Sequence, residues 1–377
     1  MTFTPHDRRW MERALELAEE ARGLAEPNPP VGAVLVRDGH VVGSGHTQPY
    51  GGPHAEVVAL EDAGECARGA TMYVTLEPCA HQGKTPPCAP RVVEAGVQRV
   101  AIAVLDPTPK THRKGVELLR KAGVEVQVGL CREQAVRGNA AFFKLAAVAK
   151  PLVIAKWAMT ADGKIATRTG DSRWISGPES RRRVHEVRGI VDCIIVGGRT
   201  ARQDDPLLTC RDAEKRRTAA RLVLCGRGVP SHDSRLVQTA DEAPVLLAYP
   251  EKTPSEGLEP LLKAGCTAVP LPALEHQPTR VAPSALLEEL GRREMSNVLV
   301  EGGSEVLGSF LDAGEVDRVM VFVAPLLVGG SQAPSAVGGV GPTEMRSARQ
   351  LSGVKVSRTG CDVLVEGRLT DPMEWAR

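Results

Sequence analysis

Aromatic residues and net charge are both scarce in this chain. Only 3% of the 377 residues are aromatic, and 47 lysines and arginines nearly cancel 46 aspartates and glutamates. A surface that binds a nucleic-acid backbone needs a basic stripe and stacking rings. The composition therefore disfavours nucleic acid as a partner and favours a small-molecule substrate.

Long apolar runs and a leader pattern are also missing. No stretch approaches the roughly 20 apolar residues of a membrane span. The first residues, MTFTPHDRRWMERALELAEEAR, mix charges at helical spacing and do not resemble a signal peptide. We therefore expect a cytoplasmic protein without membrane contact. The nine cysteines are an odd number scattered along the chain, which in a reducing compartment indicates thiols or metal ligands before disulfides.

The chain does have enough apolar residues for two cores. Hydrophobic residues make up 42% and charged residues 25%, as in ordinary globular proteins, and the length favours two domains. In the first half, helical and strand-like periodicities alternate, which predicts an α/β/α sandwich. The expected helices lie at about 7–24, 54–60, 89–95, 115–122 and 132–147, and the expected strands at 31–37, 41–45, 71–76, 99–105 and 124–128.

A second domain is predicted to begin at Pro151, because proline ends the preceding helix and opens a new strand. The expected domains are 1–150 and 151–377. The second has strands near 152–158, 193–197, 221–225, 245–248, 297–301 and 319–323. The proline- and glutamate-rich segment 249–283 is expected to be a solvated, less regular connection.

Two glycine-rich strand ends stand out in the second half, Gly197-Gly198 and Gly302-Gly303. Glycine lets backbone amides approach a pyrophosphate closely, although a pair of glycines by itself is more typical of a tight turn. The G-x-G-x-x-G fingerprint of the dinucleotide-binding fold does not occur after an early strand. A nucleotide site here would therefore belong to another fold.

The strongest motif is His54-Ala55-Glu56, followed by Cys79 after Glu77-Pro78 and then by Cys88. One imidazole and two thiolates suit tetrahedral zinc and leave a fourth position for water. In zinc deaminases that act on nucleobases, an H-x-E motif and two cysteines form this site, and the glutamate moves protons without binding the metal. Glu56 is therefore the candidate catalytic residue.

The spacing of the two cysteines leaves alternatives open. Eight residues separate them where the short form has two. Within this insertion, Lys84 can offer a charge to a phosphate, and His81 could complete a purely structural zinc site. Two other functions remain possible from the residues alone. One is a base or nucleoside deaminase fused to a cofactor-binding module with another reduction target, and the other is a nucleic-acid-binding or regulatory protein with a structural zinc and an inactive second domain.

With these motifs in view, the chain resembles the bifunctional riboflavin-biosynthesis deaminase/reductases. The resemblance covers nearly the whole sequence in the family's order. It is carried by NPPVGAV at 28–34, GSGHT at 43–47, GPHAEV at 52–57, EPC at 77–79, TPPC at 85–88, DGKIA at 162–166, DSRWIS at 171–176, DDPLLT at 204–209 and VEGG at 300–303. Departures are Thr108, where asparagine is more usual, and Thr160, where serine is common.

The resemblance implies a cytidine-deaminase-like α/β/α sandwich followed by a dihydrofolate-reductase-like α/β domain, with Zn²⁺ and NADPH as cofactors. It implies hydrolytic deamination of 2,5-diamino-6-ribosylamino-4(3H)-pyrimidinone 5′-phosphate and then NADPH-dependent reduction of the ribosyl group to ribityl. We expect this phosphorylated pyrimidine to be the partner of a homo-oligomeric enzyme.

The family pattern also implies the site residues. In the first pocket, the zinc ligands are His54, Cys79 and Cys88, Glu56 carries the proton, and the substrate contacts are Asn28, His46, Lys84 and Asp106. In the second pocket, the NADPH contacts are Ala158, Trp174, Thr200, Asp204, Gly303, Ser304, Glu305, Val306, Leu307, Gly308 and Ser309, and the substrate contacts are Ser172, Arg188, Leu208, Arg211 and Glu301.

Charge suggests two finer expectations for the second pocket. Arg188 and Arg211 suit a phosphate clamp, because guanidinium pairs with phosphate in a bidentate way, although each could be a solvated surface charge. By analogy with another fold, Arg227, just beyond the strand 221–225, could meet the 2′-phosphate of NADPH.

Overall fold

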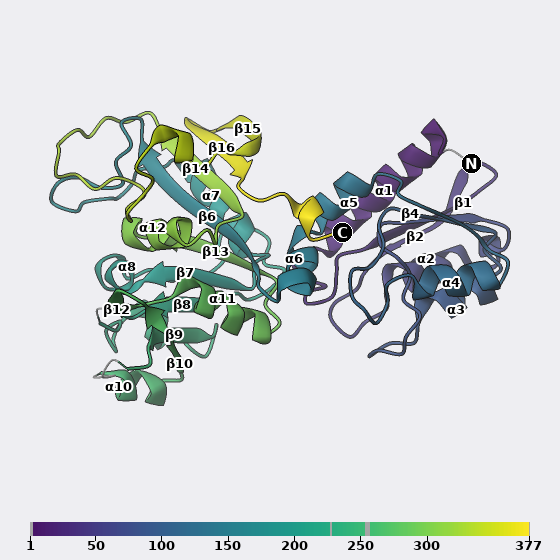
Figure 1. The fold of residues 1–377 in the computed structure, drawn as a ribbon, viewed down its shortest axis with the longest axis horizontal. Coiled ribbons are helices and arrows are strands. Elements are labelled where there is room, and N and C mark those ends of the chain that lie inside the picture. The colour runs from purple at the N-terminus through teal and green to yellow at the C-terminus, as the bar shows by residue number, and fades with distance from the viewer. Residues whose placement is uncertain (1–2, 227, 253–256, 377) are drawn as a thin grey trace. The chain divides into compact units, whose positions relative to one another are not determined.

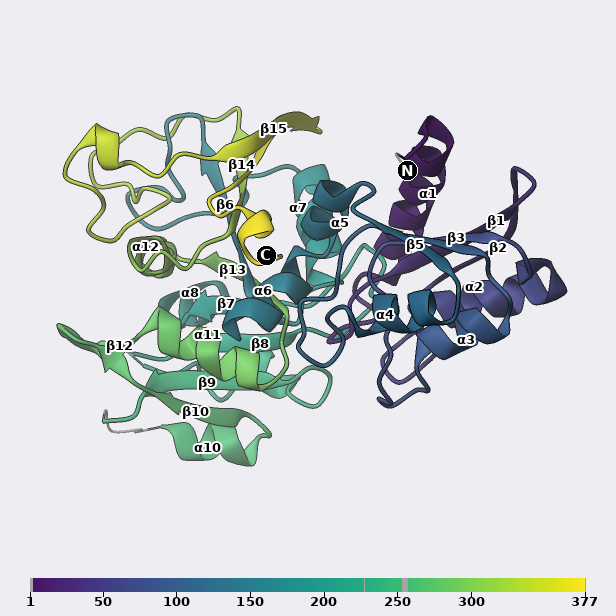
Figure 2. The same cartoon turned by 45° about the vertical axis from the view of Figure 1, so that its right-hand side comes forward.

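The computed structural model describes residues 3–226, 228–252 and 257–376. The chain forms two compact units (Figures 1 and 2). One unit spans Met1–Ala149 together with Asp371–Arg377, and the other spans Lys150–Thr370. Among the described residues, no helix combines the length and the apolar character that crossing a bilayer requires.

The first unit is built on a five-stranded sheet in the order β2-β1-β3-β4-β5. The antiparallel pair β1–β2 turns at Asp38 and Gly39, whose φ angles of 52° and 78° suit the predicted two-residue hairpin turn. Strands β3, β4 and β5 run parallel. The strands are β1 (Gly32–Arg37), β2 (His40–His46), β3 (Thr71–Val74), β4 (Arg99–Ile102) and β5 (Glu125–Val128).

Helices cover both faces of this sheet, which confirms the predicted α/β/α sandwich. In Figure 1, α1 and α5 lie on one side of the sheet and α2, α3 and α4 on the other. The predicted helix 132–147 is divided in two, because the backbone of Asn139 leaves the helical region (φ −110°, ψ 24°). The helices are α1 (Pro5–Ala21), α2 (Ala55–Ala63), η1 (Gly64–Ala67), α3 (Cys88–Glu94), α4 (Lys114–Lys121), α5 (Arg132–Gly138) and α6 (Ala140–Val148).

The second unit contains a nine-stranded sheet in the order β10-β9-β8-β7-β13-β6-β14-β16-β15. The strands from β10 to β14 in this order are parallel, and β16 and β15 add antiparallel pairings at one edge. The strands are β6 (Leu152–Thr160), β7 (Cys193–Gly197), β8 (Ala220–Leu224), β9 (Val245–Pro250), β10 (Thr267–Leu271), β13 (Asn297–Gly302), β14 (Arg318–Ala324), β15 (Ser352–Thr359) and β16 (Asp362–Arg368).

Two apolar clusters hold helices against this sheet. Side chains of α11 and α12 join one cluster, and side chains of α7, α8, α9 and α10 join the other. This α/β arrangement agrees with the predicted fold class. The helices are α7 (Pro178–Arg188), α8 (Gly198–Asp204), α9 (Arg235–Gln238), α10 (Leu258–Lys263), α11 (Pro283–Arg292), α12 (Ser304–Asp312) and η2 (Met345–Ser347).

The expectation that 249–283 is an irregular, solvated connection is wrong. The segment contains α10, the edge strand β10, and a hairpin of β11 (Ala273–Leu274) and β12 (Gln277–Val281). In β10, Val269 and Leu271 are buried at 3% and 4% exposure and alternate with more exposed residues. This two-residue period is short and interrupted by proline, so composition concealed it.

The last residues of the chain belong to the first unit, although the sequence predicts a single domain over 151–377. A single turn, η3 (Pro372–Glu374), is capped by the Asp371 side chain, which accepts a hydrogen bond from the Met373 amide. Met373, Trp375 and Ala376 pack against the apolar cluster of the first unit. Burial of these side chains accounts for the return of the chain to this unit.

Candidate functional site

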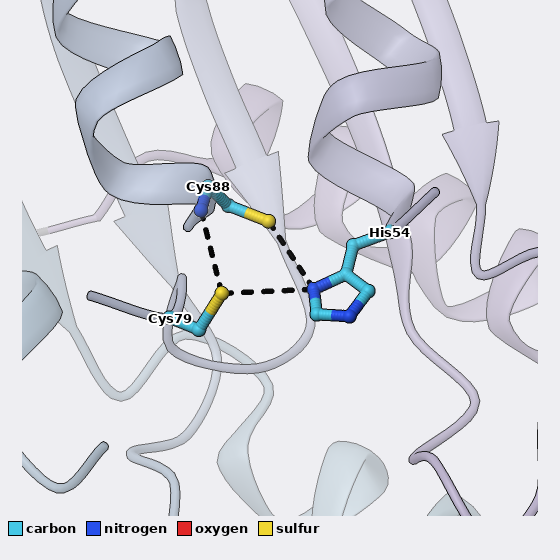
Figure 3. Close-up of side chains that lie close together, drawn as sticks. All are labelled: His54, Cys79 and Cys88. Atoms are coloured by element: carbon cyan, nitrogen blue, oxygen red, sulfur yellow. Dashed lines mark hydrogen bonds between the residues drawn. The ribbon is translucent and has the colours of Figure 1, made fainter. Parts of the chain in front are cut away.

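Three side chains converge at the ends of two helices in the first unit. His54 is the residue that precedes α2, Cys79 follows β3, and Cys88 is the first residue of α3. The Nδ1 atom of His54 lies 3.2 Å from the Sγ atom of Cys88 and 3.7 Å from that of Cys79 (Figure 3). The backbone amide of Cys88 donates to the Cys79 sulfur at 3.3 Å, so the two cysteines are also tied directly.

The loop that carries Cys79 is fixed by its neighbours. Glu77 is buried, and its carboxylate accepts hydrogen bonds from the backbone amides of Asp106, Arg113 and Val116. At Gly115, a Cβ atom would lie 1.9 Å from the carbonyl oxygen of Pro78. The start of α4 therefore lies directly against the loop, and only glycine allows this approach.

The three donors fit zinc. Their ligand atoms all lie within 4.8 Å of one another, and one imidazole with two thiols is a soft donor set. Hydrogen bonding from Cys88 is the main cause that lowers the pKa of the Cys79 thiol, which favours the thiolate that zinc binds. Within the described residues, the group of possible metal ligands contains these three side chains and not His81. The Nδ1 atom of His81 lies 3.3 Å from the Thr111 hydroxyl instead.

Glu56 lies in the first turn of α2, two residues after His54. It is only 4% exposed, and burial raises the pKa of its carboxyl to about 7. A carboxyl group with a pKa near neutrality can both accept and release a proton at physiological pH. Glu56 lines the same cavity as His54 and Cys79, so this group faces the place where a reacting molecule would lie.

The cavity has a volume of about 250 Å³. Of the four predicted substrate contacts in this unit, Asn28, Lys84 and Asp106 line it. His46 is not among the lining residues: its Nδ1 atom lies 3.1 Å from the carbonyl oxygen of Thr47, and Thr47 lines the cavity instead. The structure thus brings three of these four side chains to one space.

Several lining residues were not predicted. The Tyr50 ring lies 3.7 Å below the Lys84 ammonium, and Phe142 reaches the cavity from α6. Neither residue belongs to a sequence motif. Thr108, noted above only as a departure from the family pattern, donates to the Asp106 carboxylate from its amide (2.7 Å) and its hydroxyl (2.6 Å). Thr108 therefore holds Asp106 in place.

The second unit contains a buried ion pair. Arg188, at the end of α7, donates to the two carboxylate oxygens of Glu301 in β13 at 2.5 and 2.8 Å. The Lys156 ammonium lies 3.9 Å from the same carboxylate. Burial by itself would raise the pKa of Glu301, but the charge and hydrogen bonds of Arg188 lower it to about 2. Glu301 is therefore ionised at neutral pH.

Arg211 is linked to this ion pair through two intermediate residues. Its backbone amide donates to His185 Nδ1 at 3.0 Å, and its guanidinium donates to the Thr209 hydroxyl at 3.2 Å. Arg188 also approaches the Thr209 carbonyl, at 3.4 Å. The structure therefore brings together three of the predicted substrate contacts. The other two are Leu208, which is 3% exposed, and Ser172, which is half-buried in the segment before α7.

The predicted cofactor residues gather partly at two strand ends. Parallel neighbours β7 and β13 end at glycines, and the chain continues into α8 and α12. Gly303 has a φ of 77°, and a Cβ atom there would lie 3.1 Å from the Thr200 hydroxyl, so Thr200 adjoins the segment 303–309. In open α/β sheets, ligands ordinarily bind at the carboxyl ends of the parallel strands, where these two strand ends lie.

The other predicted cofactor residues are more dispersed. Asp204 is the last residue of α8, and its carbonyl accepts a hydrogen bond from Arg173. Ala158 lies in β6. Trp174 is 69% exposed, with the Arg181 guanidinium 4.7 Å from its ring centre. Arg227 lies outside the described residues.

Comparison with known proteins identifies both units. Residues 151–365 match the model of the RibD C-terminal domain, and residues 4–104 match that of the cytidine and deoxycytidylate deaminase zinc-binding region. The riboflavin biosynthesis protein RibD of Aquifex aeolicus is 39% identical over 95% of this chain and 97% of its own. RibD of Escherichia coli is 35% identical over 95% of this chain and 98% of its own.

Solved structures agree over the same length. The diaminohydroxyphosphoribosylaminopyrimidine deaminase/5-amino-6-(5-phosphoribosylamino)uracil reductase of Thermotoga maritima superposes with a TM-score of 0.84 at 35% identity, covering 96% of this chain and 98% of that one. RibD of Acinetobacter baumannii gives a TM-score of 0.82 at 32% identity with the same coverage. This chain belongs to the RibD family of bifunctional deaminase/reductases of riboflavin biosynthesis.

Proposed function

We propose that residues 1–150 deaminate 2,5-diamino-6-ribosylamino-4(3H)-pyrimidinone 5′-phosphate and that residues 151–377 reduce the product with NADPH. The observation that carries the proposal is the trio of His54, Cys79 and Cys88 with Glu56 beside a common cavity. Three soft ligands with a protonatable carboxyl next to them are what hydrolytic deamination of a nucleobase requires. The product of both steps is 5-amino-6-ribitylamino-uracil 5′-phosphate.

In the first reaction, His54, Cys79 and Cys88 would hold zinc, which would supply a nucleophile near neutral pH by lowering the pKa of water. Glu56 accepts one proton of the attacking water and delivers it to the leaving amino group, and the second water proton ends on the ring nitrogen next to C2. The C2–N bond breaks, ammonia leaves, and C2 keeps the oxygen of water as a carbonyl. The raised pKa of Glu56 suits it to both transfers.

Charged and polar side chains orient the substrate in this cavity. Asn28 and the Asp106 carboxylate are assigned to the polar edge of the pyrimidine. Lys84 is assigned to the 5′-phosphate, for which its ammonium is a point charge. His46 lies behind the lining, where its ring supports Thr47. These four are the residues that the family pattern assigns to the substrate.

In the second reaction, the second unit would hold NADPH, which would supply the hydride of the new C1′–H bond, while the C1′–O4′ bond of the ribose ring opens and O4′ takes up a proton from solvent. Thr200, Asp204 and the segment 303–309 are assigned to the cofactor, together with Ala158 and Trp174. The substrate residues are Ser172, Arg188, Leu208, Arg211 and Glu301. Glu301 stays ionised and accepts hydrogen bonds from ribose hydroxyls, while Arg211 meets the phosphate. Arg188 orients Glu301 with two of its donors and adds positive charge.

The remaining expectations concern the setting of the enzyme. We propose a cytoplasmic homo-oligomer whose partner is this phosphorylated pyrimidine, without nucleic acid or membrane. Labelled RNA at moderate salt should not bind, and free cytosine, cytidine and tRNA should not be deaminated.

The test supplies the zinc-loaded full chain with the diaminopyrimidinone phosphate, with and without NADPH. Ammonia should appear with and without NADPH. When NADPH is present, its absorbance should fall as the deaminated product is reduced, and the products are identified by mass. Arg211→Ala should release ammonia at the wild-type rate while NADPH oxidation is lost. If Arg211→Ala stopped both reactions in a folded, zinc-loaded protein, the assignment of one reaction to each domain would be wrong.

A further inference from the structure

Phe142 forms part of the wall of the deaminase cavity. It lies beyond residue 104, where the match to the general deaminase zinc-binding region ends. Two aromatic side chains, Tyr50 and Phe142, line the cavity, and the Lys84 ammonium lies over the ring of Tyr50. Phe142 therefore adds an aromatic face to the apolar part of the wall, which Pro29, Val31 and Leu76 also form, and a pyrimidine ring can lie against it.

The position of Phe142 depends on how α6 is packed. The helix has only nine residues and follows the non-helical Asn139, so it has little stability of its own. The ring of Phe142 meets that of Phe143 edge to face, with centroids 5.7 Å apart. Phe143 is fully buried in the core of the first unit. Tertiary contacts thus decide where Phe142 points.

The C-terminal segment supplies contacts on another side of α6. Lys144 is 5% exposed, and its ammonium lies 5.7 Å from the centre of the Trp375 ring. Residues two positions apart on a helix face different directions, so Lys144 and Phe142 point to different sides of α6. The helix therefore lies between the cavity and the C-terminal segment, whose end is seen beside α6 in Figure 2.

The same segment is also attached to α5. Arg132, the first residue of α5, donates through Nη2 to the Ala376 carbonyl at 2.6 Å. Met373 and Trp375 pack against the apolar cluster that contains Phe143. The segment 371–376 is thus held at one end by its own capped turn and at the other by α5, with Trp375 in between.

We propose that Trp375 is a positioning residue for the deaminase reaction. The C-terminal segment holds α6 so that Phe142 forms the aromatic part of the wall of the substrate site. Trp375 touches neither the zinc ligands nor the reacting atoms, so it affects how well the pyrimidine is held and not the proton transfer. The inference rests on the proposed deaminase role of residues 1–150.

The experiment measures kcat and KM for ammonia release by the zinc-loaded full chain. Trp375→Ala should raise KM about tenfold and change kcat less than about threefold, because a displaced wall weakens substrate positioning. Trp375→Phe should restore most of the affinity. Val148→Ala, at the end of α6 and 48% exposed, is the control for a change on that helix and should match the wild type. NADPH oxidation with the already deaminated substrate should stay unchanged in all variants.

A double-mutant comparison shows whether Trp375 acts through Phe142. Phe142→Ala should itself raise KM, and adding Trp375→Ala should then raise it little further. Additive losses, or an unchanged KM in Trp375→Ala, would overturn the proposal. If Trp375→Ala does not fold, the milder pair Trp375→Leu and Phe142→Leu is read in the same way, with Trp375→Phe kept as the conservative variant. A wild-type chain that released no ammonia would instead refute the proposed deaminase function.

Discussion

The two units each contain a buried glutamate beside a candidate site, and the two carboxyl groups have opposite properties. Glu56 is 4% exposed and has its pKa raised to about 7 by burial. The Glu301 side chain is 7% exposed, yet its pKa is lowered to about 2. Similar burial therefore gives a carboxyl that can exchange protons in one unit and a permanent anion in the other.

The difference comes from the cations nearby. Glu301 receives two hydrogen bonds from Arg188 and lies near Lys156, and these charges outweigh the cost of burial. Glu56 has no such guanidinium among the causes that set its pKa, so burial dominates. Glu56 suits acid–base chemistry, whereas Glu301 suits a fixed negative charge that orients hydroxyl groups and cations.

The largest effect is expected when Glu56 loses its ability to exchange protons. Glu56→Gln keeps the hydrogen-bonding shape, so ammonia release should fall about 100- to 10,000-fold while zinc stays bound. NADPH oxidation with the deaminated substrate should be unchanged. Glu61→Gln, in the same helix with a 62% exposed side chain, is the control and should behave as wild type. Ammonia release within about threefold of wild type in Glu56→Gln would remove the glutamate from the proton path.

A smaller effect, on stability, is expected when Glu301 loses its partner. Arg188→Met leaves a buried carboxylate without its bidentate cation, which should cost about 3 kcal/mol of unfolding free energy at pH 7. Chemical denaturation followed by circular dichroism measures this loss. Arg182→Met, in the same helix with a 71% exposed side chain, should change stability little. Equal stability of the two variants would mean that Arg188 does not compensate the buried charge.

The acid response of the same carboxyl should be of similar size but spread over a range of pH. Because the folded-state pKa of Glu301 lies below its ordinary value, its ionised form stabilises the fold above pH about 4.5. That contribution, on the order of 3 kcal/mol, is lost as the pH falls from there towards 2. Glu301→Gln should therefore lose less stability than wild type over this range, and denaturation midpoints at several pH values measure the difference.

Other carboxylates titrate in the same window, so the comparison needs a control. Glu259→Gln, whose side chain is 79% exposed, should follow the wild-type acid profile. A Glu301→Gln profile parallel to that of wild type would show that Glu301 has the same pKa in the folded and unfolded chains.

The deaminase site was predictable from sequence where its chemistry lies in short motifs. His54, Glu56, Cys79 and Cys88 could be named because imidazole, carboxyl and thiol groups at these spacings have few other uses. Phe142 could not, since an apolar residue in an apolar helix carries no sign of facing a cavity.

The reductase site was less predictable because its residues meet only through tertiary contacts. Arg188 and Glu301 are 113 positions apart, and nothing in the local sequence pairs them. The order of alternating helices and strands gave the fold class of both units. It failed for 249–283, where proline interrupted a short strand period, and it did not reveal that the last residues pack on the first unit.

The return of residues 371–376 to the first unit has a consequence for synthesis. Translation runs from the N-terminus, so these residues leave the ribosome only after all of Lys150–Thr370. On a nascent chain that has not reached residue 371, the apolar cluster of the first unit lacks Met373 and Trp375, and Arg132 lacks the carbonyl of Ala376. The unit that is translated first is therefore the one that is completed last.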